Sequence, residues 1–124
     1  MFVLRKSLRL SAAGLIAATA LTATPGFATP RYDGVWSVSI VTKKGDCIAS
    51  YRYPMRIANG ILANGGAIAI DVSGKVAANG AVTVRLSHGD THATASGHLA
   101  GNAGGGSWSG AGCTGSWTAE RRSS

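Results

Sequence analysis

The stretch CIASYRYPMRIANG, residues 47–60, carries the clearest structural signal in this chain. Apolar and polar side chains alternate through residues 47–57, which is typical of a β-strand with one buried face. The apolar face comprises Cys47, Ala49, Tyr51, Tyr53, Met55 and Ile57. Pro54 falls on the opposite face and has no N–H for a neighbouring strand, so it predicts a sheet edge or a bulge. Asn59-Gly60 predicts a hairpin turn, because both central positions of such a turn need a positive φ.

The same alternation continues along the rest of the chain, and no segment after residue 28 shows helical periodicity. Two strands are expected to carry Trp108 and Trp117, and the other five cover residues 34–42, 61–63, 68–76, 82–87 and 91–99. Polar or glycine-rich turns separate the strands at residues 43–46, 64–66, 79–80, 88–90 and 101–105. The chain end, residues 122–124, is expected to fray.

Eight short strands joined by tight turns predict an all-β domain. The simplest topology is an antiparallel meander that closes into a small barrel, and a β-sandwich is the alternative. The two cysteines, Cys47 and Cys113, have no metal or redox spacing and are expected to form a disulfide. In a closed meander Cys47 would open the second strand and Cys113 the eighth, both beside the first. The expected disulfide therefore supports closure.

Residues 1–28 are expected to form an N-terminal signal helix that is removed on export. Three basic residues (Arg5, Lys6 and Arg9) precede an apolar run, and small residues end at Ala28, which is the order of a secretory signal. The run is too short to span a bilayer and no second one follows, so no transmembrane anchor is expected. Cleavage would leave residues 29–124 as one domain, periplasmic or secreted, and would lower the net charge from +7 to +4.

The remaining charges argue against several functions. The basic residues are scattered, whereas a nucleic-acid site needs a basic stripe beside stacking aromatic rings. The five acidic residues are scattered too, and no nucleophile motif stands between a strand and a helix, so neither catalysis nor a cofactor is expected. The only metal candidates, His88, Asp90 and His92, surround a turn in a spacing that no metal prefers, and we predict no metal site.

The triplet Gly-x-Trp occurs three times, ending at Trp36, Trp108 and Trp117. A glycine lets the backbone pass close to an indole ring, and a tryptophan can fill a barrel end. The first triplet resembles the motif that opens the first strand of the calycins, the superfamily of lipocalins and avidins. In calycins a basic residue of the last strand lies across this tryptophan, which implies a cation–π contact between Trp36 and Arg121. The whole chain also resembles small exported bacterial β proteins of unknown function.

These features favour an exported, non-catalytic binding or interaction module. A small apolar molecule, haem included, or another exported protein would be its partner, with the barrel mouth near Tyr51, Tyr53 and Trp108 as the contact site. The candidate contact residues, all aromatic or cationic and near a barrel end, are Trp36, Tyr51, Tyr53, Trp108, Trp117 and Arg121.

Two other functions stay open at this point. The protein could inhibit an exported enzyme such as a protease, acting through residues 29–32 or through a turn. A structural role in a surface coat is the third hypothesis. An internal cavity would favour the binding module, whereas a flexible, extended mature N-terminus would favour the inhibitor.

Overall fold

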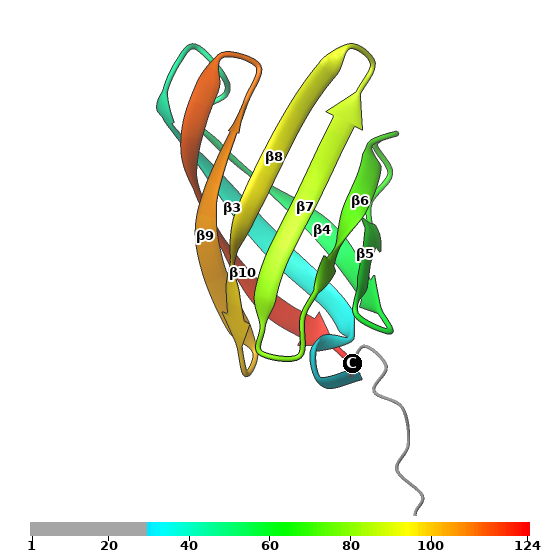
Figure 1. The fold of residues 1–124 in the computed structure, drawn as a ribbon. Helices are drawn as coiled ribbons and strands as arrows, with labels where there is room; N and C mark the ends of the chain where they lie inside the picture. The colour runs from blue at the N-terminus through cyan, green and yellow to red at the C-terminus, as the bar shows by residue number, and fades with distance from the viewer. Residues whose placement is uncertain (1–29) are drawn as a thin grey trace, which may run out of the picture.

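Residues 30–124 are described by a computed structural model, and they form a closed antiparallel barrel of eight strands (Figure 1). Each strand pairs with the next in the sequence, and the last pairs with the first. The strands are β3 (Gly34–Lys44), β4 (Ser50–Ala58), β5 (Ile61–Asn64), β6 (Asp71–Val76), β7 (Ala81–His88), β8 (Thr91–Ala100), β9 (Ala103–Gly110) and β10 (Cys113–Ser123). The predicted meander barrel is confirmed and the sandwich alternative is wrong. The predicted signal helix, residues 1–28, lies outside the described residues.

Several strand boundaries differ from those expected, because pairing with neighbours extends or shortens the local pattern. Lys44 still pairs with Thr114, so β3 runs through the first half of the expected turn at residues 43–46. At the other end of the chain Ser123 pairs with Val35, so the expectation that residue 123 frays is wrong. Gly104 and Gly105 pair on both sides within β9, which reduces the expected turn at residues 101–105 to its first two residues.

The strand expected over residues 68–76 is shorter at its start. Ile68 and Ile70 precede β6, which pairs with β7 only from Asp71 onward. The Ile70 N–H donates to the Ile68 carbonyl oxygen at 2.8 Å, which bends the chain tightly before the strand begins. Ile68 is 53% exposed, so its expected place on the buried face is wrong.

The disulfide Cys47–Cys113 is present, with its Cα atoms 6.3 Å apart, but Cys47 does not open β4. Cys47 lies in the loop between β3 and β4, residues 45–49, while Cys113 is the first residue of β10. The Thr42 N–H donates to the Ala49 carbonyl oxygen at 2.9 Å, so the chain reverses in a loop before the pairing of β4 starts at Ser50. The bridge still joins the two segments that flank β3.

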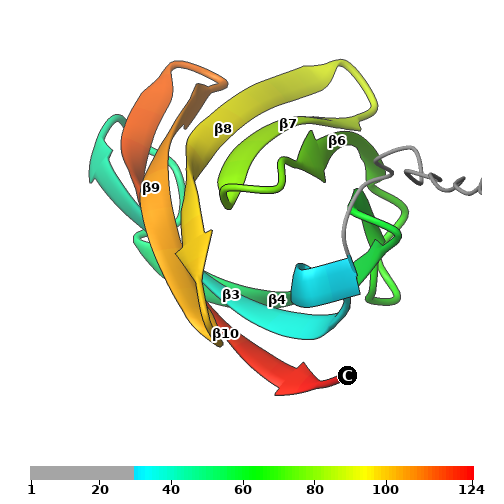
Figure 2. The ribbon, with the colours of Figure 1, turned by 60° about the horizontal axis from the view of Figure 1, so that its bottom comes forward.

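One end of the barrel, which we call the closed end, is filled by aromatic side chains. Trp36 is 1% exposed, and its Nε1–H donates to the Tyr32 carbonyl oxygen at 2.8 Å. Tyr32 ends a short 3-10 helix (Pro30–Tyr32) that lies across this end (Figure 2). The Arg121 guanidinium carbon lies 5.0 Å from the centroid of the Trp36 ring, so the contact implied by the calycin resemblance is present.

The other two Gly-x-Trp triplets face each other in β9 and β10. The register places Trp108 opposite Gly115 and Trp117 opposite Gly106. Each triplet therefore supplies the glycine that the tryptophan of the other triplet needs. A Cβ atom on Gly115 would lie 2.7 Å from the Trp108 Nε1 atom, which is closer than real Cβ contacts. The glycines of these strands thus provide room for indole rings that lie along the barrel wall.

Hydrogen bonds hold both of these rings against the wall. The Trp108 Nε1–H crosses β10 and donates to the Val41 carbonyl oxygen of β3 at 3.1 Å. The Trp117 Nε1–H crosses β9 and donates to the Ser96 carbonyl oxygen of β8 at 3.1 Å. Both indole N–H groups are therefore satisfied by backbone groups, which fixes each ring in one orientation. Residues 30–124 contain no helix with the length and apolarity needed to cross a membrane.

Candidate functional site

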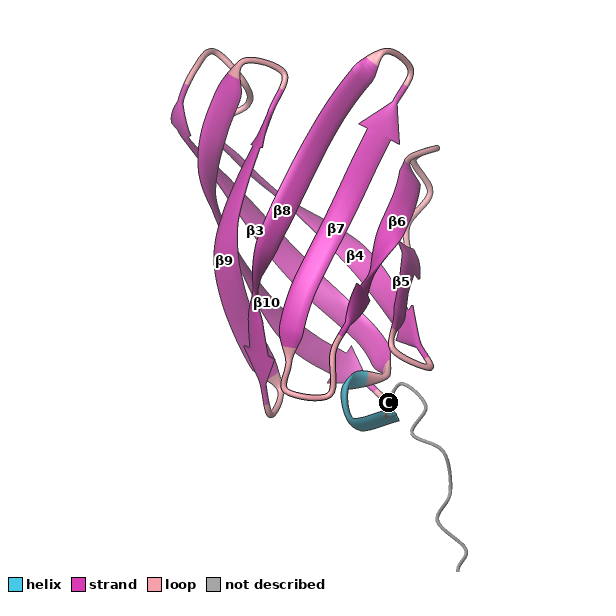
Figure 3. Cartoon of the chain, in the orientation of Figure 1, coloured by secondary structure: helices cyan, strands magenta, loops and turns pink. Residues whose placement is uncertain are grey.

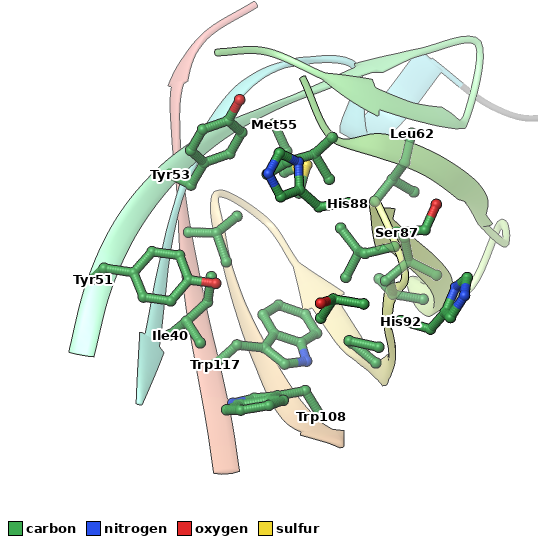
Figure 4. A pocket seen from close by; sticks show the side chains of 18 residues that line it. Ile40, Tyr51, Tyr53, Met55, Leu62, Ser87, His88, His92, Trp108 and Trp117 are labelled. Atoms are coloured by element: carbon green, nitrogen blue, oxygen red, sulfur yellow. The ribbon is translucent and has the colours of Figure 1, made fainter. Parts of the chain in front are cut away.

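A cavity of about 220 Å³ lies inside the barrel at the end opposite Trp36 (Figure 4). Inward-facing side chains of all the strands except β6 line it, and Ile70 of the preceding loop joins them. Its aliphatic wall residues are Val38, Ile40, Met55, Leu62, Ile70, Val82, Val84 and Leu86. At the mouth Tyr51 is 49% exposed, so the cavity reaches solvent there, whereas the closed end is filled.

Small side chains on β8 create the space. Ala93 and Ala95 occupy successive inward positions of this strand and line the cavity, so a larger residue at either of them would fill part of it. Trp108 and Trp117 contribute to one side of the cavity without crossing it, because their rings lie along the wall. The volume exceeds the roughly 150 Å³ that holds benzene and is below the roughly 300 Å³ of drug-sized pockets. By proportion to benzene it holds about nine heavy atoms.

Part of the cavity wall is a loop instead of a strand ladder. β5 and β6 pair only at Ile61 and Lys75, so the loop between them, residues 65–70, closes the wall nearer the mouth (Figure 3). The last pair between β4 and β5 joins Met55 to Asn64, and beyond it Pro54 accepts a hydrogen bond from the loop's Gly65 N–H at 3.2 Å. The prediction that Pro54 marks a sheet edge is therefore confirmed.

Side chains of the cavity hold this loop in place. The Tyr53 hydroxyl donates to Asn64 Oδ1 at 2.7 Å and accepts from the Ile68 N–H at 3.1 Å. At the next residue of the loop, the carbonyl oxygen of Ala69 lies 2.8 Å from His88 Nδ1. The loop is thus fastened to β4 through a tyrosine and to β7 through a histidine.

The candidate contact residues separate into two groups. Four of them line the cavity and two, Trp36 and Arg121, contact each other at the closed end. The cavity group is Tyr51, Tyr53, Trp108 and Trp117, all aromatic. The alternation of side chains along β4 identified the two tyrosines, because inward parity is a local property of the strand. The cavity opens near Tyr51, where the mouth of the barrel was expected.

The three metal candidates, His88, Asp90 and His92, do not all lie at the cavity. His88 and His92 line the cavity at its mouth, while Asp90 lies in the exposed turn between them and does not. Within residues 30–124 no group of three or more His, Cys, Asp or Glu side chains is placed to hold a metal ion.

His88 is the cavity residue that the sequence reasoning missed, since it was considered only as part of a turn. A signal for it was present. The inward face of β7 runs through alternate residues, and His88 is the next position in that series after Val82, Val84 and Leu86. Extending the alternation by one step would have placed it at the mouth.

Comparisons of the chain with protein-family models, curated proteins and solved structures find no match. The structure shows an eight-stranded barrel, and this architecture alone identifies no family. The chemistry of the cavity is therefore the basis for inferring a function.

Proposed function

We propose that this protein is an exported, non-catalytic binding protein that holds a small apolar molecule in its barrel cavity. The observation that carries the proposal is the apolar cavity of about 220 Å³ in a barrel whose other end is filled. Protein interiors rarely leave voids larger than a water molecule, and small barrels with such space hold ligands. The disulfide Cys47–Cys113 supports an oxidising, exported location, in agreement with the expected signal segment.

The size and lining of the cavity support a particular kind of ligand. A single aromatic ring with a short substituent, or an alkyl chain of about nine heavy atoms, matches the volume. The rings of Trp108 and Trp117 offer flat contact area to such a ligand. A haem group far exceeds the enclosed volume and would have to project through the mouth, so we favour a smaller ligand.

The inhibitor hypothesis receives less support. A flexible, extended N-terminal segment at residues 29–32 would have favoured this hypothesis. Arg31 and Tyr32 instead belong to the short 3-10 helix at the closed end. Tyr32 is 4% exposed and its carbonyl oxygen accepts the hydrogen bond of Trp36. Deleting this segment would also remove part of the core, so lost inhibition after deletion would not identify a contact with an enzyme.

The proposal is tested by filling the cavity. Ala95→Leu adds a branched side chain at an inward position that lines the cavity, while Thr94→Val changes the adjacent outward position as the matched control. Tryptophan emission and thermal unfolding of the mature protein are followed during titration with toluene, para-ethyltoluene and short alkanes.

We expect saturable emission changes and a raised Tm with at least one of these ligands for the wild type and for Thr94→Val, because binding to the folded state stabilises it. Ala95→Leu should remain folded and lose both effects. Equal binding by Ala95→Leu, or no binding by the wild type, would overturn the proposal.

A further inference from the structure

We infer that the cavity's ligand carries a hydroxyl group and that the Nε2 atom of His88 accepts its hydrogen bond at the mouth. The inference rests on the proposed ligand-binding function and names the chemical class of the ligand: small phenols or alcohols with one apolar part. It follows from the hydrogen bonds that the polar groups around the cavity make.

The hydrogen bond of His88 determines which ring nitrogen is available. Nδ1 lies 2.8 Å from the Ala69 carbonyl oxygen, and a carbonyl oxygen can only accept, so Nδ1 carries a hydrogen. In the neutral ring Nε2 is then unprotonated and is an acceptor. This is the only side-chain hydrogen bond of His88 within residues 30–124. The backbone of the loop at residues 65–70 therefore sets both the orientation of the ring and the role of Nε2.

The ring is placed where a ligand could reach it. His88 lines the cavity, and Figure 4 shows its ring extending over the pocket between Tyr53 and Ser87. The two nitrogens of an imidazole point in nearly opposite directions from the ring. Because Nδ1 points to the loop at residues 65–70, Nε2 points away from that loop, and His88 is exposed at the mouth.

The other anchored polar groups of the cavity are already paired. The Tyr53 hydroxyl both donates and accepts, and the Trp108 and Trp117 N–H groups donate to backbone carbonyls. The side chains of four other polar residues of the lining make no hydrogen bond within residues 30–124, so no protein contact holds their polar atoms in one orientation: Tyr51, Ser87, Thr91 and His92. The one oriented and unused polar atom is an acceptor, so the complementary group on a ligand is a donor.

A hydroxyl group at Nε2 leaves the apolar part of the ligand for the rings of Trp108 and Trp117 deeper in the cavity. A carboxylate has no hydrogen to donate and would face the lone pair of a neutral imidazole, so fatty-acid-like anions are disfavoured. A ligand with a methyl group opposite His88 Nε2 cannot make the hydrogen bond that a hydroxyl makes. The site is therefore expected to bind the hydroxyl ligand more tightly than the methyl ligand.

The test uses ligands of one shape and different polarity. Para-ethylphenol and para-ethyltoluene differ by a hydroxyl in place of a methyl group, and para-ethylbenzoate supplies the anion. Affinities are measured at about pH 8, where free imidazole is neutral, for the wild type, His88→Leu, His88→Gln and the control His98→Leu, which changes an exposed outward position of β8 that does not line the cavity. Glutamine retains an acceptor oxygen, so it separates the loss of hydrogen bonding from the loss of the ring.

We expect His88→Leu to weaken binding of para-ethylphenol by about three- to tenfold, the range of one net hydrogen bond, with para-ethyltoluene within about twofold. His88→Gln should restore part of the loss, and His98→Leu should leave both affinities within about twofold. An unchanged affinity for para-ethylphenol, equal losses for both neutral ligands, or tightest wild-type binding by para-ethylbenzoate would overturn the inference while leaving the binding function in place. If no ligand binds the wild type, both the inference and the proposed function fail.

Discussion

Arg121 holds together three parts of the closed end that are distant in the sequence. Its Nη1 donates to the Asp33 carbonyl oxygen at 2.8 Å, and its Nε and Nη2 reach Asn102 Oδ1 and the Gly101 carbonyl oxygen at 2.9 and 3.1 Å. The same group stacks on Trp36. The sequence resemblance implied only the stacking, because the oxygen acceptors come from turns whose positions depend on the closed barrel.

Replacing Arg121 should therefore lower the free energy of unfolding by more than the loss of a single hydrogen bond would. We expect Arg121→Ala to lower the free energy of unfolding by about 2 kcal/mol, and Arg121→Lys to lose more than half of that because an ammonium cannot match a planar fork. Urea denaturation measures the change. Arg122→Ala is the control, since Arg122 makes only an exposed ion pair with Glu120 and its loss should be within error. Equal losses at Arg121 and Arg122 would contradict this account.

Strand β9 has a composition that local propensity does not favour. Its sequence AGGGSWSG, residues 103–110, contains few residues with strand preference, yet it pairs along its whole length with β8 and β10. Its glycines are required for space: a Cβ atom on Gly106 would collide with the Ser96 carbonyl oxygen. The turn expected at residues 101–105 is confined to residues 101–102, because the two neighbouring strands impose the extended conformation from Ala103 onward.

Two glycines of the barrel are required for different reasons, one for space between strands and one for its backbone conformation. A Cβ atom on Gly115 would collide with the Val41 carbonyl oxygen, whereas Gly89 has open space and a positive φ of 62°. We expect Gly89→Ala to cost about 1 kcal/mol for its left-handed conformation. Gly115→Ala should cost more than about 2 kcal/mol, because the backbones of β10 and β3 must move apart.

Thermal unfolding of both variants measures the two costs. Gly115→Ala should also change the emission of Trp108, whose Nε1 atom lies over this glycine, and Gly89→Ala should not. A smaller loss for Gly115→Ala than for Gly89→Ala would show that the glycines do not serve the indole rings.

For the whole molecule, the pairing of β10 with β3 and the disulfide Cys47–Cys113 contribute separately to stability. β10 pairs with β3 along almost its entire length, so the barrel closes through a long ladder as well as through the disulfide. Among residues 30–124 the shortest strand pairing is between β5 and β6, which share one residue pair. Side chains at the mouth also stabilise this part of the barrel wall. The disulfide therefore acts mainly on the unfolded chain, in which it joins residues 66 positions apart.

Removing the disulfide should lower stability without opening the barrel. For the double variant Cys47→Ser with Cys113→Ser, we expect the free energy of unfolding to fall by about 4 kcal/mol, as the chain-entropy model gives for this separation. Near-UV circular dichroism and ligand affinity should stay unchanged, since the ladder remains. Reductant should destabilise the wild type equally and leave the double variant unaffected. If the double variant lost its near-UV signal in the absence of urea, the β10–β3 ladder would not keep the barrel closed without the disulfide, which would contradict this account.

The features of this protein that depend only on neighbouring residues could be predicted from the sequence. Alternation assigned Tyr51 and Tyr53 to the inner face, Asn59-Gly60 marked a turn, and two cysteines allowed only one pairing. These predictions succeeded because a strand has a period of two and a tight turn restricts φ over a few residues.

The volume of the cavity and the role of His88 depend on contacts between residues far apart in the sequence. The cavity is the space left between side chains of seven strands and a loop, so its volume and its open end depend on the packing of residues far apart in the sequence. The role of His88 likewise depends on the carbonyl oxygen of Ala69, 19 residues away and on another segment. The eight-stranded barrel followed from local rules, whereas the site came from volumes and hydrogen bonds that exist only once the barrel has closed.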